Sequence, residues 1–281
     1  MKVCIAGIGL IGGSLAIDLK RRGFASEIIG VDNNVHHQNI ALHSGLVDQI
    51  DTLKNAVNKA DLIILCTPVN ANREMLPDIL NWISGTSKVV TDMGSTKAGI
   101  AVAVKGHQAR GRYVASHPMA GTEFSGPMAA IGKLFDYKHA IICDRELSDT
   151  DALQAVTGMY NILNMRLSYM AATDHDIHVA YVSHISHITS FSLALSVLDK
   201  EKDEENILKL AGGGFDSTVR LAKSSADTWA PIFLQNSEYI IEVLDNYLEK
   251  MNLFRKHILE KNQEKLKELM NEANKIRKIL N

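Results

Sequence analysis

Short apolar runs alternate with longer amphipathic segments over roughly the first 170 residues of the chain. The run at 60–66, ADLIILC, is almost continuously apolar, as a parallel strand buried on both faces requires. Further strand-like runs lie at 2–6, 27–31, 88–91, 113–115, 139–143 and 166–169. Segments with helical character stand between several of them, as at 15–22, 36–44 and 70–83. This alternation predicts an N-terminal Rossmann-type, doubly wound α/β sheet.

The pattern changes near residue 172. No convincing strand follows, residues 174–198 predict one long and largely apolar helix, and the chain from 228 onward is almost entirely helix-forming. We therefore expect a sheet domain over residues 1–171 and an all-α C-terminal dimerisation domain over residues 172–281. Long apolar helices would expose much of their surface in so small a domain. Pairing with a second copy would cover them, so we expect a homodimer through the C-terminal helices.

A glycine-rich turn, GIGLIG, follows the first predicted strand and opens onto a helix. Gly7 is expected to permit the tight turn, Gly9 to leave room for a pyrophosphate, and Gly12 to let the helix pack closely on the strand. The free N–H groups at the helix N-terminus, around Leu10 and Ile11, would face the phosphates. The turn and its flanking elements predict a dinucleotide-binding site.

The second predicted strand ends at Asp32, where dinucleotide sites carry an acidic residue. A carboxylate there accepts hydrogen bonds from ribose hydroxyls and repels a 2′-phosphate, and none of the next three residues is an arginine that could hold that phosphate. We therefore expect NAD rather than NADP. Ligands of such sheets lie beyond the carboxyl ends of the strands, so Thr67 and Ser95, which follow two other strands, are expected to line the same site.

The composition is that of an ordinary soluble protein, with 281 residues of which 46% are hydrophobic and 22% charged. A net charge of -2 gives no reason to expect binding to nucleic acid or to a membrane surface. No apolar stretch approaches the ~20 residues of a membrane-spanning helix. Three cysteines in strand-like segments, without metal-site spacing, indicate buried free thiols in a reducing cytoplasm.

His117 directly follows the strand-like run at 113–115, in the segment SHPMAGTE. At that position the imidazole would enter the ligand crevice near the nicotinamide. A dehydrogenase that acts on an alcohol needs a base for the hydroxyl proton, and imidazole suits this task near neutral pH. On the residues alone, a loop histidine with a structural hydrogen bond explains the pattern equally well.

Four histidines, at 175, 178, 184 and 187, lie within 13 residues of the long predicted helix. A helical step of 100° places His175 and His178 on one face and His184 and His187 on roughly the opposite one. One straight helix cannot bring all four to one ion, so we expect no metal. We expect one face to be solvated and the other, with His184 and His187, to face the crevice or the subunit interface.

Three successive glycines at 212–214 precede Arg220 by a short interval. Glycines let the backbone approach another group closely. A planar guanidinium is a natural partner for a substrate carboxylate. A turn between helices followed by a surface arginine is the alternative explanation.

Taken together, these motifs closely resemble the prephenate/arogenate dehydrogenase family of tyrosine biosynthesis over nearly the whole chain. The resemblance rests on the glycine-rich turn, on Asp32, and on the segments TDMGSTK, SHPMAGTE, SHISH and GGGFDSTVR with Trp229. The family reaction is an oxidative decarboxylation. Prephenate and NAD give 4-hydroxyphenylpyruvate, CO₂ and NADH, and arogenate gives tyrosine in the same way. Members of the family pair their helical domains into dimers.

The resemblance also implies a role for each candidate residue. His117 takes up the ring hydroxyl proton, Ser95 orients His117 and the nicotinamide, and Arg220 binds the ring carboxylate. Aromatisation drives the loss of CO₂, so no metal is implied. Three further residues are implied on the substrate side: His187, Gly213 and Thr122.

The chain departs from the family at Ser186, where members often carry proline in Ser-His-x-Pro-His. Without that proline the helix is expected to be straighter at His187.

Three other kinds of function are alternatives to prephenate dehydrogenase. Arogenate dehydrogenase would need an acidic residue near the ammonium group, for which Glu123, Asp216 and Asp227 are candidates. A 3-hydroxyacid dehydrogenase or imine reductase has a similar two-domain plan, but the hydroxyacid enzymes carry a catalytic lysine on the long helix and residues 174–198 contain none. An NAD-sensing regulator would need no proton acceptor at the crevice, and His117 argues against it.

Overall fold

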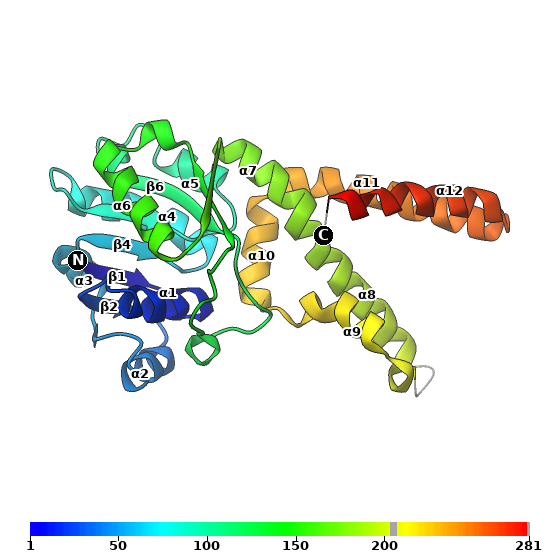
Figure 1. Ribbon diagram of the computed structural model, residues 1–281, viewed down its shortest axis with the longest axis horizontal. Coiled ribbons are helices and arrows are strands. Elements are labelled where there is room, and N and C mark those ends of the chain that lie inside the picture. The colour runs from blue at the N-terminus through cyan, green and yellow to red at the C-terminus, as the bar shows by residue number, and fades with distance from the viewer. Residues whose placement is uncertain (203–206, 280–281) are drawn as a thin grey trace. The chain divides into compact units, whose positions relative to one another are not determined.

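The computed structural model describes residues 1–202 and 207–279, and its N-terminal part is one eight-stranded sheet with helices on both faces (Figure 1). The strand order is β3-β2-β1-β4-β5-β6-β7-β8. β7 pairs antiparallel with β6 and parallel with β8, so these last two strands run against the other six. The predicted Rossmann-type sheet is confirmed. The strands are β1 (Lys2–Ala6), β2 (Glu27–Val31), β3 (Gln49–Ile50), β4 (Leu62–Leu65), β5 (Val89–Asp92), β6 (Tyr113–Pro118), β7 (His139–Cys143) and β8 (Arg166–Met170).

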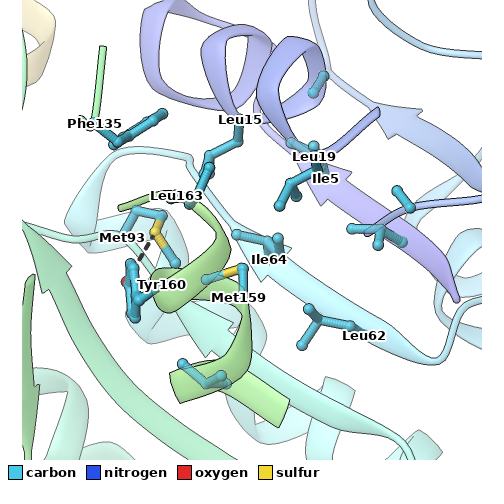
Figure 2. Close-up of a cluster of buried hydrophobic side chains, with 14 of the residues drawn as sticks. Ile5, Leu15, Leu19, Leu62, Ile64, Met93, Phe135, Met159, Tyr160 and Leu163 are labelled. Carbon is cyan, nitrogen blue, oxygen red and sulfur yellow. Dashed lines mark hydrogen bonds between the residues drawn. The ribbon is translucent and has the colours of Figure 1, made fainter. Parts of the chain in front are cut away.

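Alternate side chains of the central strands point to opposite faces, and each face buries its own core. Ile5, Leu62 and Ile64 contribute to the core that also contains side chains of α1 and α6 (Figure 2). Cys4 and Ile63 belong to the core on the other face, with side chains of α3 and α4. Burial on both faces accounts for the almost continuous apolar run of β4. The helices that connect the strands are α1 (Leu10–Arg21), α2 (Val35–His43), α3 (Leu53–Lys59), α4 (Val69–Ile83), α5 (Ala98–Ala103) and α6 (Thr150–Ile162).

The long helix expected over residues 174–198 is present but is not regular. It consists of α7 (Ala172–Val179), a π-helical turn (Ala180–His184) and α8 (Ile185–Glu201). A π-helical turn has i→i+5 hydrogen bonds and therefore holds more residues than an α-helical turn. The straighter helix expected near His187 is thus interrupted immediately before α8.

The expected division of the four histidines between two opposite faces is wrong. His175 and His184 are both buried, with 0% and 1% of their surface exposed. His178 is exposed and His187 is half-buried. The π-helical turn changes the direction in which later residues point, and packing of α7 on the sheet buries His175 as well.

Four more α-helices with assigned bounds follow α8 in the described part of the chain. The glycines at 212–214 do not form a turn between helices, because Gly212 caps α9 (Gly213–Val219) and the other two begin it. Next come α10 (Ala226–Gln235), α11 (Ser237–Leu259) and α12 (Gln263–Ala273). By their internal contacts, residues 1–236 and 237–281 form two compact units. The division of function at residues 171 and 172 stays a prediction.

Among the described residues, no helix combines the length and the apolar character that spanning a membrane requires.

Candidate active site

The glycine-rich turn after β1 is shaped by close backbone contacts. Gly7 has φ +90°, a conformation that favours glycine, and a Cβ there would lie 2.7 Å from the backbone of Cys66. A Cβ on Gly12 would lie 2.0 Å from the carbonyl oxygen of Gly7. Gly9, the N-cap of α1, has no atom within 4 Å of its Cβ position. Packing therefore requires two of the glycines, and the third leaves the N-terminus of α1 open to a ligand.

A cleft of about 1520 Å³ opens where β1, β2, β4 and β5 end. This volume exceeds the ~300–1,000 Å³ of most small-molecule pockets, so it has room for a dinucleotide and a second ligand. The predicted residues that line it are Gly7, Gly9, Leu10, Ile11, Asp32, Thr67, Ser95 and Thr122. The predicted residues that are not part of its lining are Gly12, His117, His187, Gly213 and Arg220.

Asp32 is held at the cleft wall by backbone groups on both carboxylate oxygens. Oδ2 accepts a hydrogen bond from the N–H of Ile8 at 2.9 Å, and Oδ1 accepts one from the N–H of Asn34 at 2.9 Å. Nδ1 of His37 lies 3.6 Å from Oδ2. The carboxylate thus has a fixed position at the end of β2, where it can meet a ribose.

Thr67 and Ser95 lie on the loops that follow β4 and β5. The hydroxyl of Thr67 donates a hydrogen bond to the side-chain oxygen of Asn72 in α4, which fixes the first of these loops. The hydroxyl of Ser95 makes no hydrogen bond with any other described residue, although the side chain lines the cleft. It is therefore available to a ligand.

His117 lies within β6 rather than after it, because the strand extends three residues beyond the predicted end and His117 pairs with Ile141 of β7. Its side chain is 7% exposed. Nδ1 lies 2.8 Å from Nε2 of His175. Nε2 has no hydrogen-bond partner among the described residues. It is also not among their fully buried polar atoms that lack a partner, so part of its surface is exposed. One ring nitrogen is therefore held by the protein and the other is accessible.

The histidine that holds His117 is itself held by a buried carboxylate. Nδ1 of His175 lies 2.7 Å from Oδ1 of Asp176, which is 1% exposed. The same carboxylate accepts the N–H groups of Lys97 and Ala98 at 2.7 Å and 2.8 Å, at the beginning of α5. A chain of hydrogen bonds thus runs from the loop after β5, through α7, to β6.

Burial keeps these imidazoles neutral. It lowers the pKa of His117 well below its ordinary value, and the neighbouring His175 and the ammonium group of Lys97 lower it further. Lys97 is completely buried and forms an ion pair with Asp92. Burial also lowers the pKa of His175, although Asp176 acts in the opposite direction. At neutral pH His117 is therefore an uncharged proton acceptor.

His187 reaches the cleft through an aromatic side chain. Its ring stacks on Trp229 with centroids 3.4 Å apart, and Trp229 lines the cleft. Nδ1 of His187 lies 3.1 Å from the carbonyl oxygen of Ser183. His184 packs edge-on against the same indole ring, and burial lowers its pKa to about 4.

Arg220 lies beside the cleft and is half-exposed. Its Nη1 is 3.1 Å from Oε2 of Glu123, and both Glu123 and its neighbour Thr122 line the cleft. The guanidinium is thus paired with a carboxylate that is already part of the protein. Gly213, in the first turn of α9, is exposed.

The sequence predictions missed His175 and Asp176, and Trp229 was not assigned a place in the site. The signal for the first two is their spacing, because Ala172, His175, Asp176 and Val179 form the buried side of α7. Helical spacing alone does not distinguish this buried face from a solvated one, since the surrounding residues are polar.

Both parts of the chain match models of known domains. The model described as the nucleotide-binding domain of prephenate dehydrogenase matches residues 15–169. The model described as the prephenate dehydrogenase dimerization domain matches residues 171–272. The glycine-rich turn precedes the first match, so it stands as separate support for nucleotide binding.

Individual relatives agree over the whole length. The prephenate dehydrogenase of Lactococcus lactis subsp. cremoris is 29% identical over 282 residues, which cover 99% of this chain and 77% of the relative. The crystal structure of prephenate dehydrogenase from Aquifex aeolicus in complex with hydroxyphenyl propionate and NAD+ has a TM-score of 0.87 at 28% identity, covering 100% of this chain and 98% of that one. The arogenate dehydrogenase of Synechocystis has a TM-score of 0.76 at 27% identity, covering 99% of each chain.

Two alanine substitutions in the glycine-rich turn should affect different properties, one the stability of the fold and the other the affinity for NAD. Gly12→Ala places its Cβ against a backbone oxygen, so it should lower the free energy of unfolding by more than about 1 kcal/mol. Gly9→Ala meets no neighbouring atom and should change that free energy by less than about 0.5 kcal/mol, yet it should weaken NAD binding at least about tenfold. Urea unfolding and NAD titration measure the two effects. A Gly9→Ala protein that binds NAD normally would show that no phosphate approaches this residue.

Asp32 should set the preference between the two nicotinamide dinucleotides. The unmodified protein should bind NAD at least about tenfold more tightly than NADP, because the carboxylate repels the 2′-phosphate. Asp32→Asn keeps an acceptor for the N–H of Ile8 while it removes the charge, so it should narrow the ratio of the two dissociation constants. Equal affinities of the unmodified protein for NAD and NADP, measured by titration, would contradict this role.

Proposed function

Because the chain belongs to the prephenate dehydrogenase family, we propose that it catalyses the NAD-dependent oxidative decarboxylation of prephenate to 4-hydroxyphenylpyruvate. The observation that carries the proposal is the state of His117. One of its ring nitrogens is held by a buried network, and the other is accessible and uncharged. This is the arrangement that a base for a substrate hydroxyl requires.

NAD, when bound, supplies the acceptor for the hydride that leaves the carbinol carbon of the ring. The chain offers a fitting cradle, since the Cβ position of Gly9 is open, the N-terminus of α1 faces the cleft, and Asp32 is fixed at its wall. We assign the cofactor contacts to Gly7, Gly9, Leu10, Ile11, Gly12, Asp32, Thr67 and Ser95.

The protein groups then account for the proton and the carboxylate. Nε2 of His117 takes the proton of the ring hydroxyl as the C–H bond breaks. The bond between the ring and its carboxylate then breaks, and its electron pair enters the ring, which becomes aromatic as CO₂ leaves. The oxygen on the aromatic ring is then a phenolate, and the proton held by His117 converts it to the phenol. The side chain of Ser95 lines the cleft and its hydroxyl has no hydrogen-bond partner among the described residues, so it can orient His117 and the nicotinamide.

The substrate side is assigned to the helical part of the chain and the loop after β6. Arg220 binds the ring carboxylate, which would replace or join Glu123 as its partner. His187, stacked on Trp229, contacts the ring, while Thr122 and Gly213 complete this side. In this assignment residues 1–171 bind NAD and contribute Thr122 to the substrate side, while residues 172–281 supply the other named substrate contacts and the subunit interface.

We also propose a cytoplasmic homodimer that pairs through its C-terminal helices. The match to a dimerization domain supports pairing. On α11, Ile241, Leu248, Met251 and Ile258 are exposed at spacings of seven, three and seven residues, which place them along one face. The free thiols of the three cysteines fit a reducing compartment.

Arogenate is the alternative substrate, because one of the similar structures is an arogenate dehydrogenase. Its ammonium group would need an acidic partner. Glu123 and Asp227 both line the cleft, and Glu123 is paired with Arg220, so Asp227 is the first candidate for that partner. Comparison of kcat/KM for the two substrates, followed by NADH absorbance, decides between them. Absence of NADH formation with both would contradict the proposed function.

His117→Asn should retain substrate binding and lower kcat by about 10²–10⁴-fold, because the base is lost while the packing is nearly preserved. In the unmodified enzyme kcat/KM should fall with decreasing pH as His117 becomes protonated. Since burial lowers the pKa of His117, that fall should lie below the range of an exposed histidine, near 6.5. Steady-state rates across pH measure both effects. Near-native kcat in the variant would remove His117 from the mechanism.

Arg220→Ala should raise KM for prephenate by at least about tenfold, because an unpaired carboxylate in the site costs roughly 2–5 kcal/mol. NAD affinity should barely change. Arg220→Lys should recover only part of the loss, since lysine lacks the planar fork. The matched control is Lys223→Ala, which removes a neighbouring exposed cation paired with Asp216. Equal KM values in the Arg220 and Lys223 variants would place the substrate carboxylate elsewhere.

A further inference from the structure

His117 is the end of a buried line of three side chains. The line consists of the carboxylate of Asp176, the imidazole of His175 and the imidazole of His117, joined by contacts of 2.7 Å and 2.8 Å. None of the three side chains is more than 7% exposed. In such an environment each polar contact must be a real hydrogen bond, because an unpaired buried donor or acceptor is costly.

The carboxylate determines the direction of every hydrogen bond in the line. Ionised Asp176 can only accept, so Nδ1 of His175 carries a hydrogen and donates it. A neutral His175 then has a lone pair on Nε2, which must accept from Nδ1 of His117. His117 is left with its lone pair on Nε2, the accessible nitrogen.

The orientation of Asp176 is itself fixed. Its two oxygens accept the backbone N–H groups of Lys97 and Ala98, so the carboxylate cannot rotate away without leaving buried donors unpaired. The side-chain amide of Asn236 also donates to the backbone carbonyl of Asp176 at 2.8 Å. The carboxylate at the beginning of the line therefore has a fixed orientation.

The same line of side chains also affects the positive charge that His117 gains when it accepts a proton. When His117 accepts a proton it becomes an imidazolium close to the buried ammonium group of Lys97, whose charge disfavours it. The neighbouring His175 and His184 act in the same direction. A charged His175 would oppose the imidazolium, but a neutral His175 accepts a hydrogen bond from protonated His117 and donates one to Asp176, which stabilises the charge that forms during the reaction.

We propose that His175 and Asp176 are positioning residues, which hold His117 as the Nδ1–H tautomer and stabilise its protonated form during catalysis. The proposal rests on the proposed role of His117 as the base. It assigns a specific task to two residues of α7 that touch neither the cleft nor, in this account, the substrate.

The first test reads the tautomer without any substrate. In ¹⁵N-histidine-labelled protein, the resonances of His117, assigned by their loss in His117→Asn, should show Nδ1 as the protonated nitrogen and Nε2 as the unprotonated one. Asp176→Asn can donate to His175 and so reverse the line, which should move the hydrogen of His117 to Nε2. A protonated Nε2 in the unmodified protein would overturn the proposal, whether or not the variant folds. This outcome is independent of which substrate the enzyme uses.

The second test separates positioning from packing. Asp176→Asn should lower kcat for NADH formation from prephenate by about 10²–10⁴-fold and leave KM within about twofold. His175→Gln keeps an acceptor for Nδ1 of His117 and should retain more activity than His175→Leu, which fills the space without one. Equal kcat for the Gln and Leu variants, or an unchanged kcat in Asp176→Asn, would contradict the proposal.

The matched control is Asp18→Asn in α1. Asp18 is also a fully buried carboxylate that accepts a backbone N–H, that of Lys133 at 2.9 Å, but it has no link to His117. This variant should lower thermal stability while the ¹⁵N pattern of His117 stays unchanged. A changed tautomer in Asp18→Asn would show that general loosening, and not the line from Asp176, controls His117. If the unmodified protein oxidises neither prephenate nor arogenate, the proposed function fails, while the tautomer experiment still decides this inference.

Discussion

The buried carboxylate of Asp176 is the contact on which the arrangement of the site depends. It accepts two backbone N–H groups at the beginning of α5 and one hydrogen bond from His175, and His175 holds His117 in β6. A single side chain thus ties α7 to the beginning of α5 and, through His175, to β6. Its removal would leave two buried backbone donors unpaired, at a cost of about 1–3 kcal/mol for each. Fold stability and the position of the base are therefore coupled.

The strand order explains why the glycine-rich turn and the loops after β4 and β5 meet in one cleft, with His117 on the next strand of the sheet. β1, β4, β5 and β6 are adjacent in the sheet. The glycine-rich turn follows the first of these strands, Thr67 and Ser95 follow the next two, and His117 lies near the end of the fourth. The residues that we propose as cofactor contacts, and His117 as the proposed base, therefore lie in the same order as the strands, at the carboxyl ends where such sheets bind ligands.

Periodicity and the glycine spacing were sufficient to predict the sheet, the dinucleotide turn and the position of Asp32 after a strand. They place the end of β6 three residues early, because its last residues are stabilised by antiparallel pairing with β7, a long-range contact. They missed His175, because helical geometry applied to a straight helix does not include a π-helical turn or show which face packs on the sheet. The pairing of Arg220 with Glu123 is likewise a contact across 97 positions that no local pattern contains.

We propose that one oxidation and one decarboxylation occur together in this site, with His117 as the base. The most direct measurement is the ratio of NADH formed to CO₂ released from carboxyl-labelled prephenate by the purified protein. Each prephenate consumed should give one NADH and one CO₂, with 4-hydroxyphenylpyruvate as the product. NADH formation without release of CO₂, or release of CO₂ without NADH, would contradict it.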